Sequence, residues 1–122
     1  QGIVGQAVKA MEEQGAKPEN IVAALGPCIW QDYYEVDSQT MMEFTGKDDQ
    51  SRRFFVESEK EGHFMFDLPA FVRADVLSKG VGECQLPVSD TYMNEDYYSC
   101  RRNAHNYAGA YGGQVSVIML KD

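Results

Sequence analysis

Apolar side chains recur at three- and four-residue spacing in two stretches of the chain, which is the pattern of an amphipathic helix. The first stretch predicts a helix over residues 2–14, ended by Gly15, with apolar positions Ile3, Val4, Ala7, Val8 and Met11. The second predicts a helix over residues 67–79, capped by Asp67 and ended by Gly80. Its apolar face carries Leu68, Val72 and Val76.

Continuous or β-branched apolar runs predict the strands. The run at 21–25 follows a polar turn and indicates a strand covered on both faces. Further strands are predicted at 53–56, at 84–88 (an edge strand, because it contains a proline) and at 115–120. Residues 31–44 suggest one or two short helices, and residues 46–51, 58–62 and 89–113 suggest loops. Helices alternating with strands predict a mixed α/β fold, a layered α-β sandwich with helices packed on a mixed sheet.

Composition narrows the class of protein. A length of 122 residues fits a single domain or a fragment of a larger one. The formal charge of −8 and pI near 4.7 argue against nucleic-acid binding, and no apolar run is long enough to span a membrane. Three widely spaced cysteines argue against a disulfide framework and favour the cytoplasm. The first helix begins without a capping residue, so we expect the native chain to continue upstream.

Cys28 is the first candidate for chemistry, because it follows a Gly-Pro break at the end of the predicted strand 21–25. The commoner role of a free cysteine is that of a small buried apolar residue. A catalytic role would need a neighbouring base or cation to stabilise the thiolate. His63 and His105 are the only histidines in the sequence, and they lack the i, i+4 spacing of a helical metal site. A surface or capping role is the favoured interpretation for both histidines.

The second candidate is the run from Tyr97 to His105. Arg101 and Arg102 would bind an anion such as phosphate, and the ring of Tyr98 would stack on a base. The alternative is a solvated arginine pair that offsets an acidic surface.

Three segments in this order resemble the carboxy-terminal half of the laccase-domain family. Residues 25–36 are similar to its I-G-P-C-I-G-P-x-x-Y-E-V pattern, residues 97–102 to its F-F-S-x-R-R pattern and residues 67–81, more weakly, to a pattern between them. Members were once called multicopper polyphenol oxidases and are now regarded as zinc-dependent purine nucleoside enzymes. The resemblance therefore implies phosphorolysis of a purine nucleoside by phosphate, and adenosine deamination by a metal-activated water.

This sequence departs from the family pattern in ways that matter. The family's His-Cys-His metal set lies in upstream segments that do not occur here, so we assign no metal ligand in this chain, whether for zinc or for copper. A C-T-Y motif stands as Asp90-Thr91-Tyr92, and a T-G-R motif as Gly112-Gly113-Gln114. We therefore expect Cys28, Arg101, Arg102 and Tyr98 to form part of a pocket that an upstream half completes. The isolated chain is predicted to be inactive.

Three alternatives remain open from the sequence. A polyphenol oxidase, as the family was formerly labelled, would need more histidines than the two present. A non-catalytic fragment would complete its sheet with another chain or a second copy of itself, through the first helix and the edge of strand 21–25. A cysteine hydrolase would use Cys28 with His63 or His105.

Overall fold

The computed structural model describes residues 2–46, 49–106, 109 and 112–118. In these residues the helices are α1 (Ile3–Glu13), α2 (Ser38–Thr45), α3 (Leu68–Ser78) and α4 (Cys100–His105). The strands are β1 (Val22–Ala24), β2 (Glu35–Asp37), β3 (Phe55–Glu57), β4 (His63–Phe66) and β5 (Glu83–Gln85). Short 3-10 turns cover Pro18–Asn20, Gln31–Tyr33 and Asp49–Phe54.

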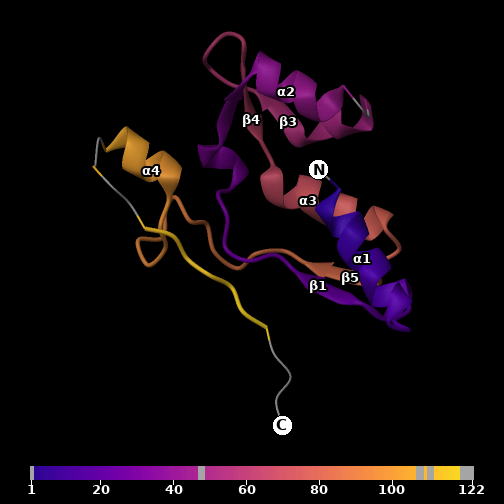
Figure 1. Cartoon of the computed structure of the whole chain (residues 1–122). Coiled ribbons are helices and arrows are strands. Elements are labelled where there is room, and N and C mark those ends of the chain that lie inside the picture. The colour runs from indigo at the N-terminus through magenta and orange to yellow at the C-terminus, as the bar shows by residue number, and fades with distance from the viewer. Residues whose placement is uncertain (1, 47–48, 107–108, 110–111, 119–122) are drawn as a thin grey trace.

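The predicted mixed α/β class is confirmed, but the strands form two separate sheets instead of one mixed sheet. β1 and β5 pair in parallel, with Val22 opposite Glu83. The other sheet has the antiparallel order β2-β4-β3, with Val36 opposite Phe64. Figure 1 shows α3 between the two sheets, with α2 beside the antiparallel one and α1 beside the parallel one.

Each sheet has its own hydrophobic cluster, and α3 contributes to both. Near the parallel sheet the buried residues are Val8, Val76, Val81 and Cys84. Near the antiparallel sheet they are Val36, Met41, Phe55 and Phe66. Val72 and Leu77 of α3 pack against the first cluster, whereas Leu68 and Phe71 of the same helix pack against the second. One helix therefore joins the two cores.

The two helices predicted from periodicity are confirmed, and so are their ends. The carboxylate of Asp67 accepts the backbone N–H of Ala70 at 3.0 Å, which caps α3. Gly15 and Gly80 follow α1 and α3 with φ of 94° and 84°, a region that glycine enters without steric cost. Gly2 precedes α1, and no side chain caps that helix.

Several expectations from the sequence are corrected. The 21–25 strand forms as β1, but it is not covered on both faces, because Val22 and Ala24, which share one face, are exposed. Residues 31–44 contain β2 as well as helical turns. The 53–56 strand forms two residues later as β3, and its partner β4 was not anticipated.

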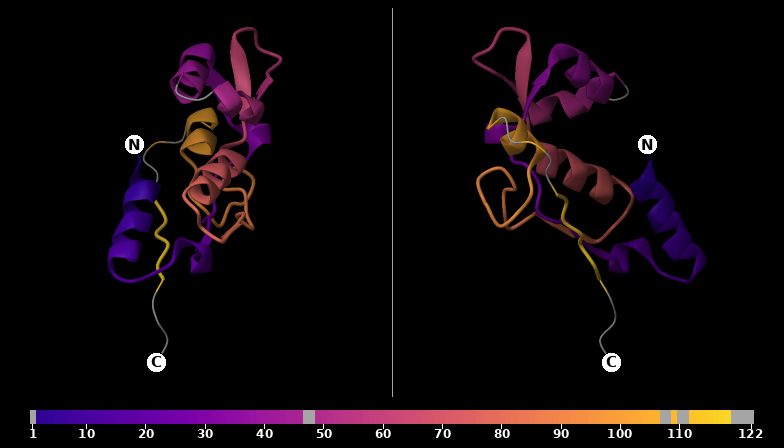
Figure 2. Two further views of the ribbon diagram at one scale, coloured as in Figure 1. Left: turned by 90° about the vertical axis from the view of Figure 1, so that its right-hand side faces the viewer. Right: turned by 60° about the vertical axis from the view of Figure 1, so that its left-hand side comes forward.

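Two further corrections concern the carboxy-terminal third. Residues 89–113 are not loop throughout, because Ser99 caps the short helix α4 through the N–H of Arg102. The terminal strand predicted at 115–120 does not form over 115–118, where the chain is extended and exposed, and its last two residues lie outside the described part. Figure 2 shows this yellow segment crossing the molecule away from α4.

Candidate functional site

The segments that leave β1 and β5 stay side by side and meet again at Cys28 and Asp90. Leu25 donates its N–H to the carbonyl of Gln85 at 3.0 Å, just past the parallel sheet. A single parallel bridge then joins Cys28 to Asp90, and Thr91 donates its N–H to the carbonyl of Cys28 at 3.0 Å. The ends of two parallel strands thus bring a thiol and a carboxylate together, at the kind of position where α/β folds build their sites.

The carboxylate of Asp90 is buried, with 6% of the residue exposed. Its Oδ1 accepts the backbone N–H of Trp30 at 3.3 Å and that of Tyr92 at 2.9 Å. Its Oδ2 is buried and has no hydrogen-bond partner among the described residues. A buried, unpaired carboxylate oxygen is costly to maintain, because burial removes its hydration.

The electrostatic surroundings of Cys28 keep its thiol protonated. Burial raises the pKa of this half-buried thiol above its ordinary value, and the negative charges of Asp90 and Asp67 raise it further. Thiolate nucleophiles need the opposite surroundings, a nearby cation or base. The geometry therefore fits a residue that lines the site better than one that attacks a substrate.

The guanidinium of Arg102 is engaged with the backbone of the 91–97 loop. Its Nη1 donates to the carbonyls of Thr91 at 2.7 Å, Tyr92 at 2.8 Å and Asn94 at 3.2 Å. Its Nη2 donates to the carbonyl of Tyr97 at 2.5 Å. These four acceptors make Arg102 the residue that shapes this loop. Binding of an anion by Arg102 would compete with these bonds.

Arg101, by contrast, retains free donors. Its Nη1 donates to the backbone carbonyl of Glu35 at 2.9 Å, and its guanidinium carbon lies 5.5 Å from the centre of the Tyr34 ring. Its Nη2 and Nε have no partner among the residues that the structure describes. The Glu35 carboxylate accepts a hydrogen bond from Ser58, which lowers the pKa of Glu35 and keeps it ionised. Of the two arginines, Arg101 is the one available to an anion.

Tyr98 lies where α4 and the carboxy-terminal segment meet. The residue is 54% exposed, and its N–H donates to Oε1 of Gln114 at 3.0 Å. Gly112 lies against the Tyr98 ring, so closely that a Cβ at that position would come within 2.6 Å of a ring carbon. The segment then passes Gly26, where a Cβ would lie 3.0 Å from the Ser116 hydroxyl. Tyr98 therefore has an exposed ring face, but one already flanked by Gly112.

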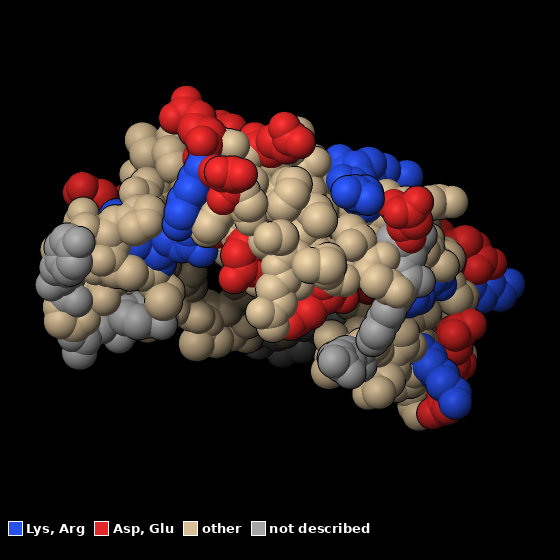
Figure 3. Space-filling model, turned by 90° about the horizontal axis from the view of Figure 1, so that it is seen from above, with Lys and Arg blue, Asp and Glu red and all other residues tan. Residues whose placement is uncertain are grey.

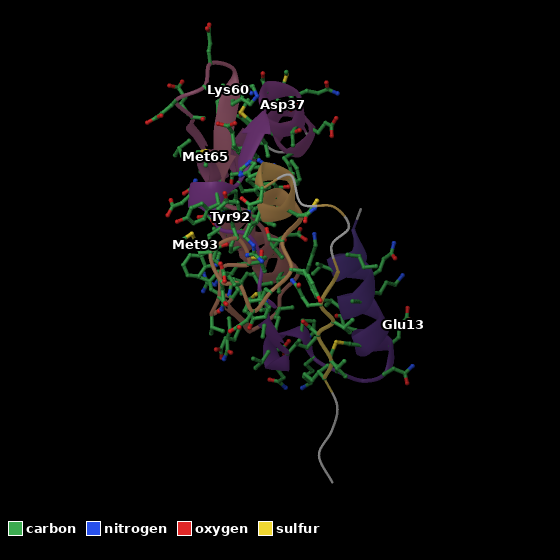
Figure 4. The ribbon with its side chains drawn as sticks, turned by 90° about the vertical axis from the view of Figure 1, so that its left-hand side faces the viewer. Glu13, Asp37, Lys60, Met65, Tyr92 and Met93 are labelled. Carbon is green, nitrogen blue, oxygen red and sulfur yellow. The ribbon has the colours of Figure 1, made fainter. Side chains whose placement is uncertain are left out.

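The two histidines bond to different partners on different elements. His63 Nδ1 lies 3.0 Å from the carbonyl of Glu61 at the start of β4. His105, at the end of α4, lies with Nδ1 2.9 Å from the hydroxyl of Tyr92, whose ring stacks on that of Tyr33 at a centroid distance of 4.7 Å. Figure 4 shows Tyr92 among the other side chains and Met93 at the outer edge. The geometry thus gives no support for pairing Cys28 with either imidazole.

A pocket of about 350 Å³ opens beside the segment that follows Cys28. Its walls come from residues 30–32, from the start of α3 and from the chain just past β5. Trp30, 41% exposed, forms one wall, and Asp67 lies both at this pocket and within electrostatic reach of Cys28. The pocket and the Cys28–Asp90 pair therefore adjoin.

Charges on the surface are mixed. Seen from above, one face carries acidic and basic side chains around a hollow that has acidic atoms at its margin (Figure 3). Within the described ranges, no three His, Cys, Asp or Glu side chains are grouped so as to hold a metal ion. The described residues alone therefore do not supply the ligand set of a metal centre. Among the helices described, none is long and apolar enough to cross a membrane.

A parallel pair of strands, a thiol and a buried acid at their ends, and an adjoining pocket define a mixed α/β protein with its candidate site at the strand ends. The chain belongs to the Multi-copper polyphenol oxidoreductase laccase family, which it matches over residues 1–121.

Two similar crystal structures share the fold. A Neisseria meningitidis protein of family DUF152 has 27% identity and a TM-score of 0.69, covering 83% of this chain and 42% of its own. A hypothetical protein YfiH from Bacillus licheniformis has 24% identity and a TM-score of 0.74, covering 84% of this chain and 40% of its own.

Curated relatives carry a functional name. The chain is 39% identical over 120 residues to a purine nucleoside phosphorylase from Rickettsia prowazekii and 38% identical over 120 residues to one from Rickettsia conorii. A purine nucleoside phosphorylase from Deinococcus radiodurans is 37% identical over 121 residues. The matches cover 98% of this chain but 49%, 49% and 44% of those proteins. The chain thus spans about half the length of these relatives.

Asp90 is the site residue that sequence reasoning did not single out. It was noted as a departure from the family's C-T-Y motif, but its burial was not foreseen. The available signal was local, because an Asp whose side chain accepts the N–H two residues later forms an Asx turn. The sequence likewise places Trp30 in a motif but gives no sign that this residue forms the wall of a pocket.

Proposed function

We propose that this chain forms the carboxy-terminal half of a purine nucleoside phosphorylase, with Arg101 as its phosphate-binding residue. The observation that supports the proposal is the 39% identity across nearly the whole chain to a protein of that name. Arg101 suits the role because its guanidinium is held by Glu35 and Tyr34 yet keeps donors free.

Phosphorolysis fits the state of Cys28. In this reaction a phosphate oxygen forms a bond to the sugar C1′, the bond between C1′ and the base nitrogen breaks, and its electron pair leaves with the base, which takes up a proton. Phosphate supplies the attacking atom, so no protein nucleophile is required. A protonated Cys28 thiol is therefore compatible with this chemistry, whereas a cysteine hydrolase would need a thiolate.

Polyphenol oxidation and adenosine deamination gain no support from the described residues. Copper oxidation would require several imidazoles at one place, but the two histidines lie on β4 and α4 with separate partners. Zinc, which the family resemblance implies, finds no group of three ligands among the residues that the structure describes.

We further propose that an upstream half pairs with the open side of β1. Val22 on this strand is 63% exposed, and apolar residues on other segments are exposed as well, with Ile3 at 72% and Val117 at 82%. An unpaired strand edge with exposed apolar side chains is a surface suited to strand addition. The relatives are about twice as long as this chain, which is enough to supply the missing strands.

The test is a chimera that joins this chain to the upstream half of the Rickettsia prowazekii enzyme, in place of that enzyme's own second half. We expect phosphate-dependent release of hypoxanthine from inosine by the chimera and none by the isolated chain. Arg101→Ala should raise the KM for phosphate about tenfold, as the loss of a charge-assisted contact of about 1.4 kcal/mol predicts. The matched control is Arg53→Ala, since Arg53 lies over Phe54. Equal effects of the two substitutions would contradict the assignment.

A further inference from the structure

We propose that the pocket beside Trp30 binds the purine base of the nucleoside, with the base stacked on the indole ring. The inference rests on the proposed function and adds to it the place and the orientation of the base. The pocket volume of about 350 Å³ lies at the lower end of the ~300–1000 Å³ range of ligand pockets.

The apolar walls suit a flat ring. Trp30 lines the pocket and is 41% exposed, so part of the residue is accessible to a ligand. The other apolar walls are Pro69, Ala70, Leu86 and Pro87. Planar heteroaromatic rings stack favourably on tryptophan, and this contact is insensitive to the identity of the base.

The pocket offers acceptors for N–H groups of a ligand. Asp67 uses Oδ1 for the cap of α3, and Asp32 is an exposed carboxylate. Gln31 donates through Nε2 to the carbonyl of Met65 at 3.3 Å, and its amide oxygen is a further acceptor. A ligand with N–H donors suits these acceptors, as the ring N–H of hypoxanthine or the amino group of adenine does.

The same charges exclude phosphate from this pocket. Two carboxylates line it and none of its lining residues is Lys or Arg, so an anion would be repelled. Arg101, in contrast, sits on Tyr34 and Glu35, a few residues farther along the segment that lines the pocket. Base and phosphate would thus be held at opposite ends of one short segment, residues 30–35.

The chain offers its own probe, because Trp30 is the sole tryptophan in the sequence. Adenosine titrated into the chain should quench its fluorescence in a saturable manner. Ribose 5-phosphate, which has no base, should not. Caffeine stacks equally well but has no N–H donor, and it should bind at least about tenfold more weakly, the factor that corresponds to one lost hydrogen bond to a charged group.

Substitutions at three pocket residues test the location. Ala70→Phe fills the pocket and should abolish quenching by adenosine, whereas Ala10→Phe on the exposed surface of α1 is the matched control and should leave quenching unchanged. Asp32→Ala, at an exposed position that does not depend on core packing, should weaken adenosine several-fold and leave caffeine unaffected. By calorimetry, Trp30→Ala should weaken adenosine binding by about tenfold to a hundredfold, as base stacking on an aromatic ring predicts.

The outcomes separate this proposal from the proposed function. Absence of quenching by adenosine, equal quenching by ribose 5-phosphate, or quenching that survives Ala70→Phe would each refute the base pocket. If the chimera still cleaves inosine in that case, the phosphorylase assignment stands and the pocket assignment falls. If adenosine binds as expected but the chimera releases no base, the pocket assignment stands and the phosphorylase assignment falls.

Discussion

Cys28 and Asp90 face each other across a single parallel bridge, so that a thiol is held next to a buried carboxylate. The backbone of Thr91 and the side chain of Asp90 both bond to the 28–30 segment, which fixes the two residues in register. Burial is the main reason that the thiol resists ionisation, and the negative charge of Asp90 adds to it. The pairing also makes the two residues the most direct place to test the electrostatics of the site.

Alkylation should distinguish Cys28 from Cys100. We expect iodoacetamide to react with the exposed Cys100 at pH 7.5 faster than with Cys28, because the raised pKa of Cys28 leaves little thiolate at that pH. The rate at Cys28 should keep rising as the pH is raised above 7.5, because its pKa is raised. Asp90→Asn should lower the pKa of Cys28 and so increase its rate at pH 7.5. Mass spectrometry of the modified peptides measures each rate. Faster modification of Cys28 than of Cys100 would restore the nucleophile hypothesis.

Substitutions at Asp90 should have opposite consequences for stability. Asp90→Asn keeps an oxygen to accept the N–H groups of Trp30 and Tyr92 while removing a buried charge, so the free energy of unfolding at pH 7 should be unchanged or higher. Asp90→Ala leaves both donors without their acceptor and should cost about 2 kcal/mol. Urea denaturation compares the two variants. A loss of similar size in both would mean that the charge itself is needed.

The two adjacent arginines should also differ. Arg102→Ala should lower the free energy of unfolding by about 2–4 kcal/mol, because four backbone carbonyls lose a charged donor. Arg101→Ala should cost only about 1 kcal/mol, since one hydrogen bond and one ring contact are lost. Arg102→Lys should behave like Arg102→Ala, because an ammonium group cannot reproduce the planar fork. If both alanine variants unfold alike, the division of roles is wrong.

Acid stability should depend on Glu35. The hydrogen bond from Ser58 is the largest cause of the lowered pKa of this carboxyl. A carboxyl whose pKa is lower in the folded state stabilises the fold at pH values above its unfolded pKa, and that contribution is lost as the pH falls through its folded pKa. Ser58→Ala should therefore raise the pKa of Glu35 toward its ordinary value and shift acid unfolding to higher pH. Carboxyl titration by NMR, with Ser78→Ala as a control on an unrelated hydroxyl, measures the effect.

Local chemistry was enough to predict α1, α3 and β1. Their apolar spacing is regular, and Asp67 and the glycines that follow the helices mark the ends. The antiparallel sheet was harder to see. Residues of β2 lie between two helical turns, and β4 was taken for a transition before a helix, because its pairing is set by contacts such as Val36 with Phe64 that are distant in sequence.

The site residues remain a prediction. Cys28, Arg101, Arg102 and Tyr98 were chosen for their residue types, but the sequence does not show which hydrogen-bond donors the fold occupies. Arg102 donates to four backbone carbonyls of the loop that ends at Tyr97, whereas Arg101 donates to one carbonyl, that of Glu35. The strand expected at 115–120 rested on β-branched residues, and over 115–118 these residues find no partner strand among the described residues.

The single helix α3, eleven residues long, contributes side chains to both apolar clusters. Neither half of the molecule can lose its order without exposing apolar surface on that helix, so the two halves should melt together in one cooperative transition. A destabilising substitution in α3 would consequently disturb both the pocket wall around Ala70 and the parallel sheet.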